Sequence, residues 1–135
     1  MEYKIAIRSH KRVKEVGKYS LKILKGISPK KIYIFVGPDE IEEYKQAYPE
    51  YNIVDGGNQM TNYCNLKIRD YFDKNEYIIQ MDDDITQLKL ALGQKEMVDM
   101  CPLKLIEHGW EEMKKFNATI WGLYPVCNPY FMKPN

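Results

Sequence analysis

EYIIQMDDDITQL, residues 76–88, is the stretch that decides the fold we expect for this chain. Its apolar run, Tyr77 to Ile79, is typical of a strand buried in the middle of a parallel sheet. Three carboxylates, Asp82 to Asp84, follow directly where that strand ends. Ligands of open α/β sheets bind outside the carboxyl ends of the strands, so the acidic cluster stands where a site is expected.

The acidic cluster favours a divalent cation. Two carboxylates about 5 Å apart repel each other by roughly 3 kcal/mol at an effective dielectric constant of about 20. Mg²⁺ and Mn²⁺ take oxygen ligands, often one or two carboxylates together with substrate phosphates. Because residues two apart point the same way in an extended chain, we expect Asp82 and Asp84 to face one ion, with Asp83 turned aside or toward a sugar hydroxyl. The alternative is a solvated acidic turn in which Asp84 caps a helix over residues 85–92.

Composition describes one ordinary globular domain. The chain has 135 residues, 44% of them hydrophobic, and a formal net charge of +1, which gives no sign of a nucleic-acid coat. It shows no run of eighteen apolar residues and no signal peptide, so we expect a soluble, cytoplasmic protein without a membrane span. Cys64, Cys101 and Cys127 are odd in number and widely spaced, which argues for reduced core thiols over a disulfide framework or zinc site.

The pattern of a strand followed by a helix repeats three times before the acidic stretch. Strands are expected over residues 3–7, 31–36 and 52–54, and helices over 13–27, 39–48 (capped by Asp39) and 60–72. Such units predict a parallel sheet with right-handed crossovers. The loops after the four strands, residues 8–12, 37–39, 55–58 and 82–84, then meet at one edge of the sheet, and that convergence carries more weight than any single loop.

The pattern changes after Leu92. Residues 93–99 are polar and predict a loop, and Pro102 opens a helix that Asn117 ends. Gly109 inside that helix is a weak point of about 1 kcal/mol. A further strand is expected over residues 118–126.

The basic turn RSHKR, residues 8–12, is the second candidate binding loop. Backbone N–H groups, cations, a hydroxyl and an imidazole at a strand–helix junction favour anions, although a solvated basic turn explains the same residues. An anion site beside a divalent cation suggests that the chain binds a nucleotide. The turns at Gly37 and Gly56 would let a base or ribose approach the main chain, or are ordinary turns. The sequence has no GxxxxGK[ST] and no GxGxxG after the first strand, which excludes a P-loop ATPase and disfavours a dinucleotide fold.

Four segments resemble one known family in their order along the chain. IAIRSHKRV, IYIFVGPDE, YIIQMDDDI and WGLYPVCNPYFM are similar to the GT-A glycosyltransferases with an Asp-x-Asp motif, and most of all to the small glycosyltransferases of large DNA viruses and the TET-associated DNA glycosyltransferases. The resemblance covers nearly the whole chain. It implies a GT-A-like, Rossmann-like α/β fold with a mostly parallel sheet and flanking helices. It also implies transfer of a sugar from a nucleotide-sugar, a UDP-sugar by preference, to a glycan or a modified DNA base, by a viral protein acting in the host cytoplasm.

The resemblance assigns a role to each loop. Asp82 and Asp84 would hold Mn²⁺ or Mg²⁺, which acts as a Lewis acid on the leaving diphosphate. The nucleotide would be bound by Ser9, His10, Lys11, Arg12, Gly37, Pro38, Asp39, Gly56, Gly57, Asn62 and Asp83. No residue stands out as a catalytic base, and such domains are usually longer, with the acceptor side in their later part. We therefore expect a fragment, a natural truncation or a donor-binding half, able to form a homo-oligomer through an unpaired strand edge.

Two rival functions stay open. A nucleotidyltransferase uses the same sheet edge and a metal, but normally carries a glycine-rich loop where this chain has RSHKR. A nucleotide- and metal-binding module without turnover agrees with the missing acceptor half, while the intact aspartate cluster speaks against it.

Overall fold

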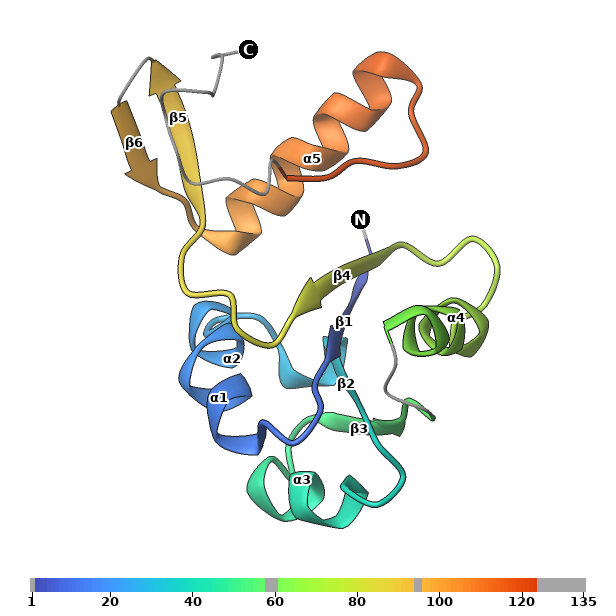
Figure 1. Cartoon of the computed structure of the whole chain (residues 1–135). Helices are drawn as coiled ribbons and strands as arrows, with labels where there is room; N and C mark the ends of the chain where they lie inside the picture. The colour runs from blue at the N-terminus through green and yellow to red at the C-terminus, as the bar shows by residue number, and fades with distance from the viewer. Residues whose placement is uncertain (1, 58–60, 94–95, 124–135) are drawn as a thin grey trace. The chain divides into compact units, whose positions relative to one another are not determined.

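The computed structural model describes residues 2–57, 61–93 and 96–123, which divide into two compact units, Met1–Thr86 and Gln87–Asn135 (Figure 1). The first unit contains, in chain order, β1 (Lys4–Arg8), α1 (Val13–Lys18), α2 (Ser20–Ile23), the short 3-10 helix η1 (Pro29–Lys31), β2 (Ile32–Val36), α3 (Ile41–Ala47), β3 (Asn52–Asp55), α4 (Thr61–Tyr71) and β4 (Ile78–Asp82). The second unit contains β5 (Lys89–Gly93), β6 (Glu96–Asp99) and α5 (Pro102–Phe116).

The first unit is built on a four-stranded sheet in the order β3-β2-β1-β4, and all three strand pairs are parallel. This confirms the parallel sheet flanked by helices, an arrangement compatible with a Rossmann-like fold. The predicted central position of the acidic strand is wrong, because β4 is the end strand of the described sheet and pairs only with β1. With a neighbour on one side alone, none of its five residues is buried.

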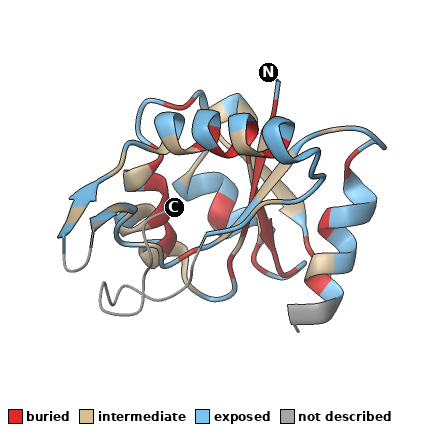
Figure 2. Cartoon of the chain, turned by 90° about the horizontal axis from the view of Figure 1, so that it is seen from above, coloured by how far each residue is buried: buried red, intermediate tan, exposed pale blue. Residues whose placement is uncertain are grey.

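Helices cover both faces of this sheet, with α1, α2 and α3 on one side and α4 on the other (Figure 1). Side chains of successive strand residues alternate between the faces. Ala6 and Phe35 accordingly pack against Cys64 and Ile68 of α4 in a buried cluster. The side chains of Ile5 and Ile7, which alternate with Ala6 along β1, point to the opposite face. Figure 2 shows buried residues along the central strands and on the inward sides of the helices. The prediction of core thiols is confirmed for Cys64 and wrong for Cys101, which is exposed, and Cys127 lies outside the described residues.

The helix expected over residues 13–27 is broken into α1 and α2. The chain departs from helical geometry at Tyr19, where φ is −112° and ψ is −88°. The next residue, Ser20, is fully buried, and its Oγ donates to the carbonyl oxygen of Asp82 (2.7 Å) and accepts the N–H of Ile85 (3.0 Å). These two hydrogen bonds tie the break to the acidic turn, which the local periodicity did not show.

A glycine is needed at position 17 of α1 because Tyr48, the C-cap residue of α3, packs against it. A Cβ at this position would overlap the hydroxyl of Tyr48, which donates to the carbonyl of Val13. The Tyr48 ring also contacts the rings of Tyr44 and Tyr51, with centroids 6.4 and 6.2 Å away, so it has little room to shift. Tyr48 therefore occupies the volume that any larger residue at position 17 needs.

We expect Gly17→Ala to destabilise the protein. Overpacking of this kind costs about 1–3 kcal/mol, which exceeds the gain of about 1 kcal/mol from better helix propensity. The urea midpoint of unfolding measures the change. Gly122→Ala is the matched control, since a Cβ there meets nothing within 4 Å. A Gly17→Ala protein as stable as the wild type would contradict this packing.

Four further expectations are corrected. Asp39 does not cap α3, whose N-cap residue is Glu40, and Asp39 is exposed. Neither the helix over residues 85–92 nor the loop over 93–99 is found among the described residues, because β5 and β6 pair there as antiparallel strands, and residues 94–95 lie outside the described part. The spacing of Ile85, Leu88 and Leu92 fits a helix, yet the alternation from Lys89 to Leu92 fits a strand and prevails. Residues 118–123 form no strand, and the rest of that predicted strand lies outside the described residues.

The last helix of the second unit, α5, has the ends that the sequence predicts. Pro102 is its first residue, and Asn117 ends it in the left-handed conformation with φ of 49°. The glycine inside it has a packing reason, since a Cβ on Gly109 would lie 2.6 Å from the ring of Trp121.

Candidate functional site

The candidate site lies at the carboxyl edge of the first unit's sheet. Because the four strands are parallel, the loops that follow them share this edge. The chain passes from β1 to β2 and β3 on one side of β1, then crosses to β4 on its other side. Open α/β sheets bind ligands at such a reversal of strand order. The two loops at the reversal are the basic turn, residues 8–12, and the acidic turn, residues 82–84.

Arginines of the basic turn neutralise the acidic turn. Arg8 forms an ion pair with Asp82 across the neighbouring strands. The Nη1 atom of Arg12 lies 3.0 Å from Oδ1 of Asp83 and 3.2 Å from Oδ2 of Asp84. The hydrogen bond to Asp84 and the charge of Asp83 raise the pKa of Arg12 above its ordinary value, which keeps it positively charged. The repulsion within the aspartate cluster is thus relieved by two guanidinium groups.

The three aspartates differ in exposure. The side chains of Asp82 and Asp84 are 56% and 50% exposed, whereas Asp83 is buried. Oδ2 of Asp83 accepts the hydroxyl proton of Ser9 at 2.8 Å, and Ser9 is itself buried. Burial raises the pKa of Asp83, while the Ser9 hydrogen bond and the charge of Arg12 lower it. Asp82 and Asp84 therefore face solvent, and Asp83 and Ser9 join the two turns internally.

Glu40, the N-cap residue of α3, and Tyr44, within α3, form hydrogen bonds with the basic turn. The buried carboxylate of Glu40 accepts the N–H of Lys11 and that of Gly37 (3.1 Å), and its Oε2 lies 2.7 Å from Nδ1 of His10. The hydroxyl of Tyr44 accepts the N–H of Arg12 at 3.2 Å. Neither Glu40 nor Tyr44 was predicted from the sequence as a site residue. Their signal was faint: an acid directly after the GPD turn, and a tyrosine one helical turn later.

The other predicted nucleotide-binding residues are spread along this edge. Gly37 is buried, and Pro38 and Asp39 are exposed. The N–H of Gly56 donates to the Val36 carbonyl at 2.8 Å, and the N–H of Gly57 donates to Oδ1 of Asp55 at 2.7 Å. The β3 loop stands three strand spacings from the acidic turn, roughly 14 Å at about 4.8 Å per strand. Asn62 belongs to α4, and its side chain is outside the described residues.

A divalent cation fits this edge only together with a ligand. The described residues include no group of three or more histidine, cysteine, aspartate or glutamate side chains placed to hold a metal ion. Asp82 and Asp84 supply two exposed carboxylates. Mg²⁺ and Mn²⁺ are commonly bound by one or two carboxylates, with water and substrate phosphates completing the coordination. The donor set therefore suits a metal–diphosphate complex better than a bare ion.

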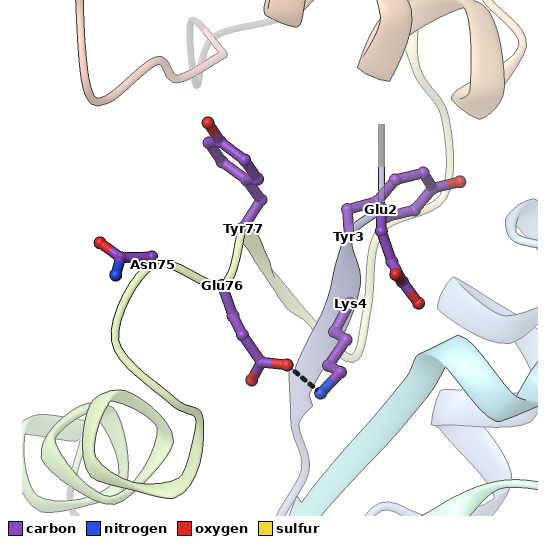
Figure 3. Close-up of a pocket in the computed structure, with 6 residues that line it drawn as sticks. All are labelled: Glu2, Tyr3, Lys4, Asn75, Glu76 and Tyr77. Atoms are coloured by element: carbon purple, nitrogen blue, oxygen red, sulfur yellow. Dashed lines mark hydrogen bonds and ion pairs between the residues drawn. The ribbon is translucent and has the colours of Figure 1, made fainter.

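A separate pocket of ≈ 270 Å³ lies at the opposite, amino edge of the sheet (Figure 3). It is lined by Glu2, Tyr3, Lys4, Asn75, Glu76 and Tyr77. Lys4 pairs with Glu76 there, and its Nζ also lies 5.5 Å from the ring centroid of Phe72. These charged groups are paired within the protein, and none of the loops discussed above reaches this edge. We therefore place the candidate site at the carboxyl edge.

The Lys4–Glu76 pair makes stability depend on pH. The hydrogen bond from Lys4 lowers the pKa of Glu76 below its ordinary value of 4.5. A carboxylate with a lowered pKa stabilises the fold above that ordinary value, and this contribution disappears as the pH falls through the folded-state pKa. We expect Glu76→Gln to be less stable than the wild type at pH 7, with the difference vanishing in acid. Urea midpoints measured from pH 7 to pH 2 test this, with Glu2→Gln as control; parallel curves for Glu76→Gln would contradict it.

No family of known proteins, no curated protein and no solved structure matches this chain. Within the described residues, none of the helices has the length and apolar character needed to cross a bilayer.

Proposed function

We propose that the carboxyl edge binds a nucleotide-sugar together with Mn²⁺ or Mg²⁺ and that the protein transfers the sugar to an acceptor. The observation that carries this proposal is the direct contact of an acidic and a basic turn at the reversal of strand order. A diphosphate with a divalent cation needs both charges side by side. Asp82 and Asp84 would hold the cation, which when bound supplies Lewis acidity toward the leaving diphosphate.

The guanidinium groups of Arg8 and Arg12 are the proposed diphosphate ligands. Guanidinium matches phosphate oxygens with two parallel hydrogen bonds and keeps its charge at all relevant pH values. In the structure both groups are held by aspartates at the same edge. Nucleotide binding therefore needs an exchange of partners.

That exchange predicts strong coupling between the two ligands. If Asp82 and Asp84 held a cation, Arg8 and Arg12 would lose these carboxylates as partners and would become available to phosphate. A diphosphate on the arginines in turn releases carboxylates to the cation. Because coupling between two binding events is reciprocal, each ligand raises the affinity for the other by the same factor.

The strand order suggests how a nucleotide lies on the edge. The diphosphate belongs beside β1 and β4, where the charges are. The turns at Gly37 and Gly56, after β2 and β3, lie progressively farther from the acidic turn and suit the ribose and base. The choice of uridine, a glycan or modified DNA base as acceptor, and a viral, cytoplasmic setting rest on the resemblance to the GT-A family.

A donor-binding module without turnover is the second candidate. It is favoured by the pairing of every aspartate of the acidic turn with an arginine, which leaves none of them as a free proton acceptor. Release of UDP from a UDP-sugar, with and without acceptors, separates the two functions.

The test of the proposed site is calorimetric titration of the protein with UDP in the presence and absence of Mn²⁺. We expect binding with Mn²⁺ and more than about 100-fold weaker binding without it, a difference of about 3 kcal/mol. Uridine, which has no phosphate, is the control ligand and should not show the metal effect. Equal UDP affinity with and without Mn²⁺ would overturn the proposal.

A further inference from the structure

We propose that Glu40 and Tyr44, one turn apart at the start of α3, are positioning residues that hold the basic turn, residues 8–12, in the shape that binds the diphosphate. The inference rests on the proposed nucleotide site and concerns the residues that fix the conformation of that site. Neither residue is one of the proposed ligand contacts, and Glu40 directly follows the Gly37 turn, whose N–H it also accepts. Both are buried, and together they contact every residue from Ser9 to Arg12.

The basic turn has an unusual backbone that needs such support. Lys11 adopts a positive φ of 54°, a conformation that non-glycine residues seldom take. Its N–H donates to Glu40, and the following N–H, of Arg12, donates to Tyr44. Two residues before Lys11, the N–H of Ser9 donates to the carbonyl of Phe35. The reversal of the chain at Lys11 is therefore held by two α3 side chains.

The same contacts determine how the turn can bind an anion. Three of its backbone N–H groups are already used within the protein. Phosphate recognition at this turn consequently relies mainly on side chains, among which Arg8 and Arg12 are the proposed ligands. A long arginine side chain carries about 2 kcal/mol of rotamer entropy, so it binds well only where its backbone and partners are fixed.

Tyr44 also connects the basic turn to the acidic turn. The hydroxyl proton of Ser9 goes to Asp83, so in the 2.7 Å contact between Ser9 and Tyr44 the tyrosine is the donor. Burial raises the pKa of Tyr44, which keeps the phenol protonated for this role. The chain of hydrogen bonds runs from the Arg12 N–H through Tyr44 and Ser9 to Asp83. Removing the phenol oxygen breaks the chain at its middle without removing any proposed ligand contact.

Tyr44→Phe and Glu40→Gln test this role, and Tyr48→Phe is the matched control. Tyr48 follows α3 and also loses a hydroxyl hydrogen bond, but its partner is the carbonyl of Val13 outside the basic turn. In the free protein, we expect amide hydrogen exchange at Lys11 to accelerate in Glu40→Gln and at Arg12 in Tyr44→Phe, and neither to change in Tyr48→Phe. The affinity for UDP with Mn²⁺ should fall about tenfold in the two α3 variants only.

The ionic-strength dependence of UDP binding separates positioning from a general loss of stability. If Arg12 is no longer held in place, fewer charges meet the diphosphate, and the affinity of Tyr44→Phe should depend less steeply on salt than that of the wild type or Tyr48→Phe. Unchanged exchange at Lys11 and Arg12 would overturn the positioning role, as would wild-type affinity in both α3 variants. Failure of the wild type to bind UDP would instead overturn the proposed function, so the two failures are distinct.

Discussion

Replacing both exposed aspartates, Asp82→Asn together with Asp84→Asn, is expected to remove the effect of Mn²⁺ on UDP binding. The cation loses its two carboxylate ligands, and the affinity for UDP in the presence of Mn²⁺ should fall roughly 100-fold, which corresponds to about 3 kcal/mol. The metal-free affinity should move in the opposite direction, because Arg8 and Arg12 no longer have these carboxylates as competitors for the diphosphate.

This pair of opposite shifts separates a lost site from a damaged fold. A misfolded protein would lose both affinities, whereas the proposed partner exchange predicts loss of one and a gain in the other. Asp70→Asn is the matched control, since it breaks an exposed pair of Asp70 with Arg69 near the end of α4. A double variant that still binds UDP in a Mn²⁺-dependent way would show that the cation is held elsewhere.

Ser20→Ala is expected to produce the largest loss of stability from a single small change. The substitution removes the donor to the Asp82 carbonyl and the acceptor of the Ile85 N–H in a fully buried position. A buried polar group that loses its partner costs about 1–3 kcal/mol, so we expect a loss of about 2–4 kcal/mol for the two groups together. The affinity for UDP with Mn²⁺ should also fall, about tenfold, because these two hydrogen bonds hold both ends of the acidic turn in place.

Urea unfolding and calorimetry on the same preparation measure both effects. Ser28→Ala is the control: Ser28 is exposed, and its side chain makes no capping hydrogen bond to η1. We expect its stability and affinity to match the wild type. A Ser20→Ala protein with wild-type stability would mean that water or a shifted backbone replaces the serine, and that the break between α1 and α2 has another cause.

Much of the fold follows from local patterns in the sequence. Apolar runs such as KIYIFV, followed by helical repeats, predict parallel strands with helical crossovers, and the four-stranded sheet confirms them. The ends of α5 are marked by residues with fixed backbone preferences, Pro102 and Asn117. Such signals depend on a few neighbouring residues, which is why they can be recognised without the tertiary structure.

The missed features depend on contacts between distant segments. Ser20 breaks a helix because its partners lie more than sixty residues away in the acidic turn. Glu40 resembles an ordinary acid at a helix start, and only the position of the basic turn shows that it accepts backbone N–H groups there. The placement of β4 at the end of the described sheet depends on which strand it joins, which a run of apolar residues does not encode.

In the candidate site too, local patterns are predicted from the sequence, whereas contacts between distant segments are not. The sequence predicts that loops of opposite charge share one edge of a parallel sheet, and the structure places the basic and acidic turns in contact there. It does not predict that Asp83 and Ser9 bond to each other in the interior. Their pairing depends on the register of β1 against β4, in which Arg8 lies opposite Asp82.

The most direct test of the nucleotide–metal site is paramagnetic broadening of backbone amide NMR signals by Mn²⁺ in the presence of UDP. The proposal predicts that signals of residues 8–12 and 82–84 broaden at low Mn²⁺, that UDP strengthens the effect, and that signals of residues 75–77 at the opposite edge stay sharp. Broadening centred on residues 75–77, or none at the carboxyl edge at any Mn²⁺ concentration with UDP present, would contradict it.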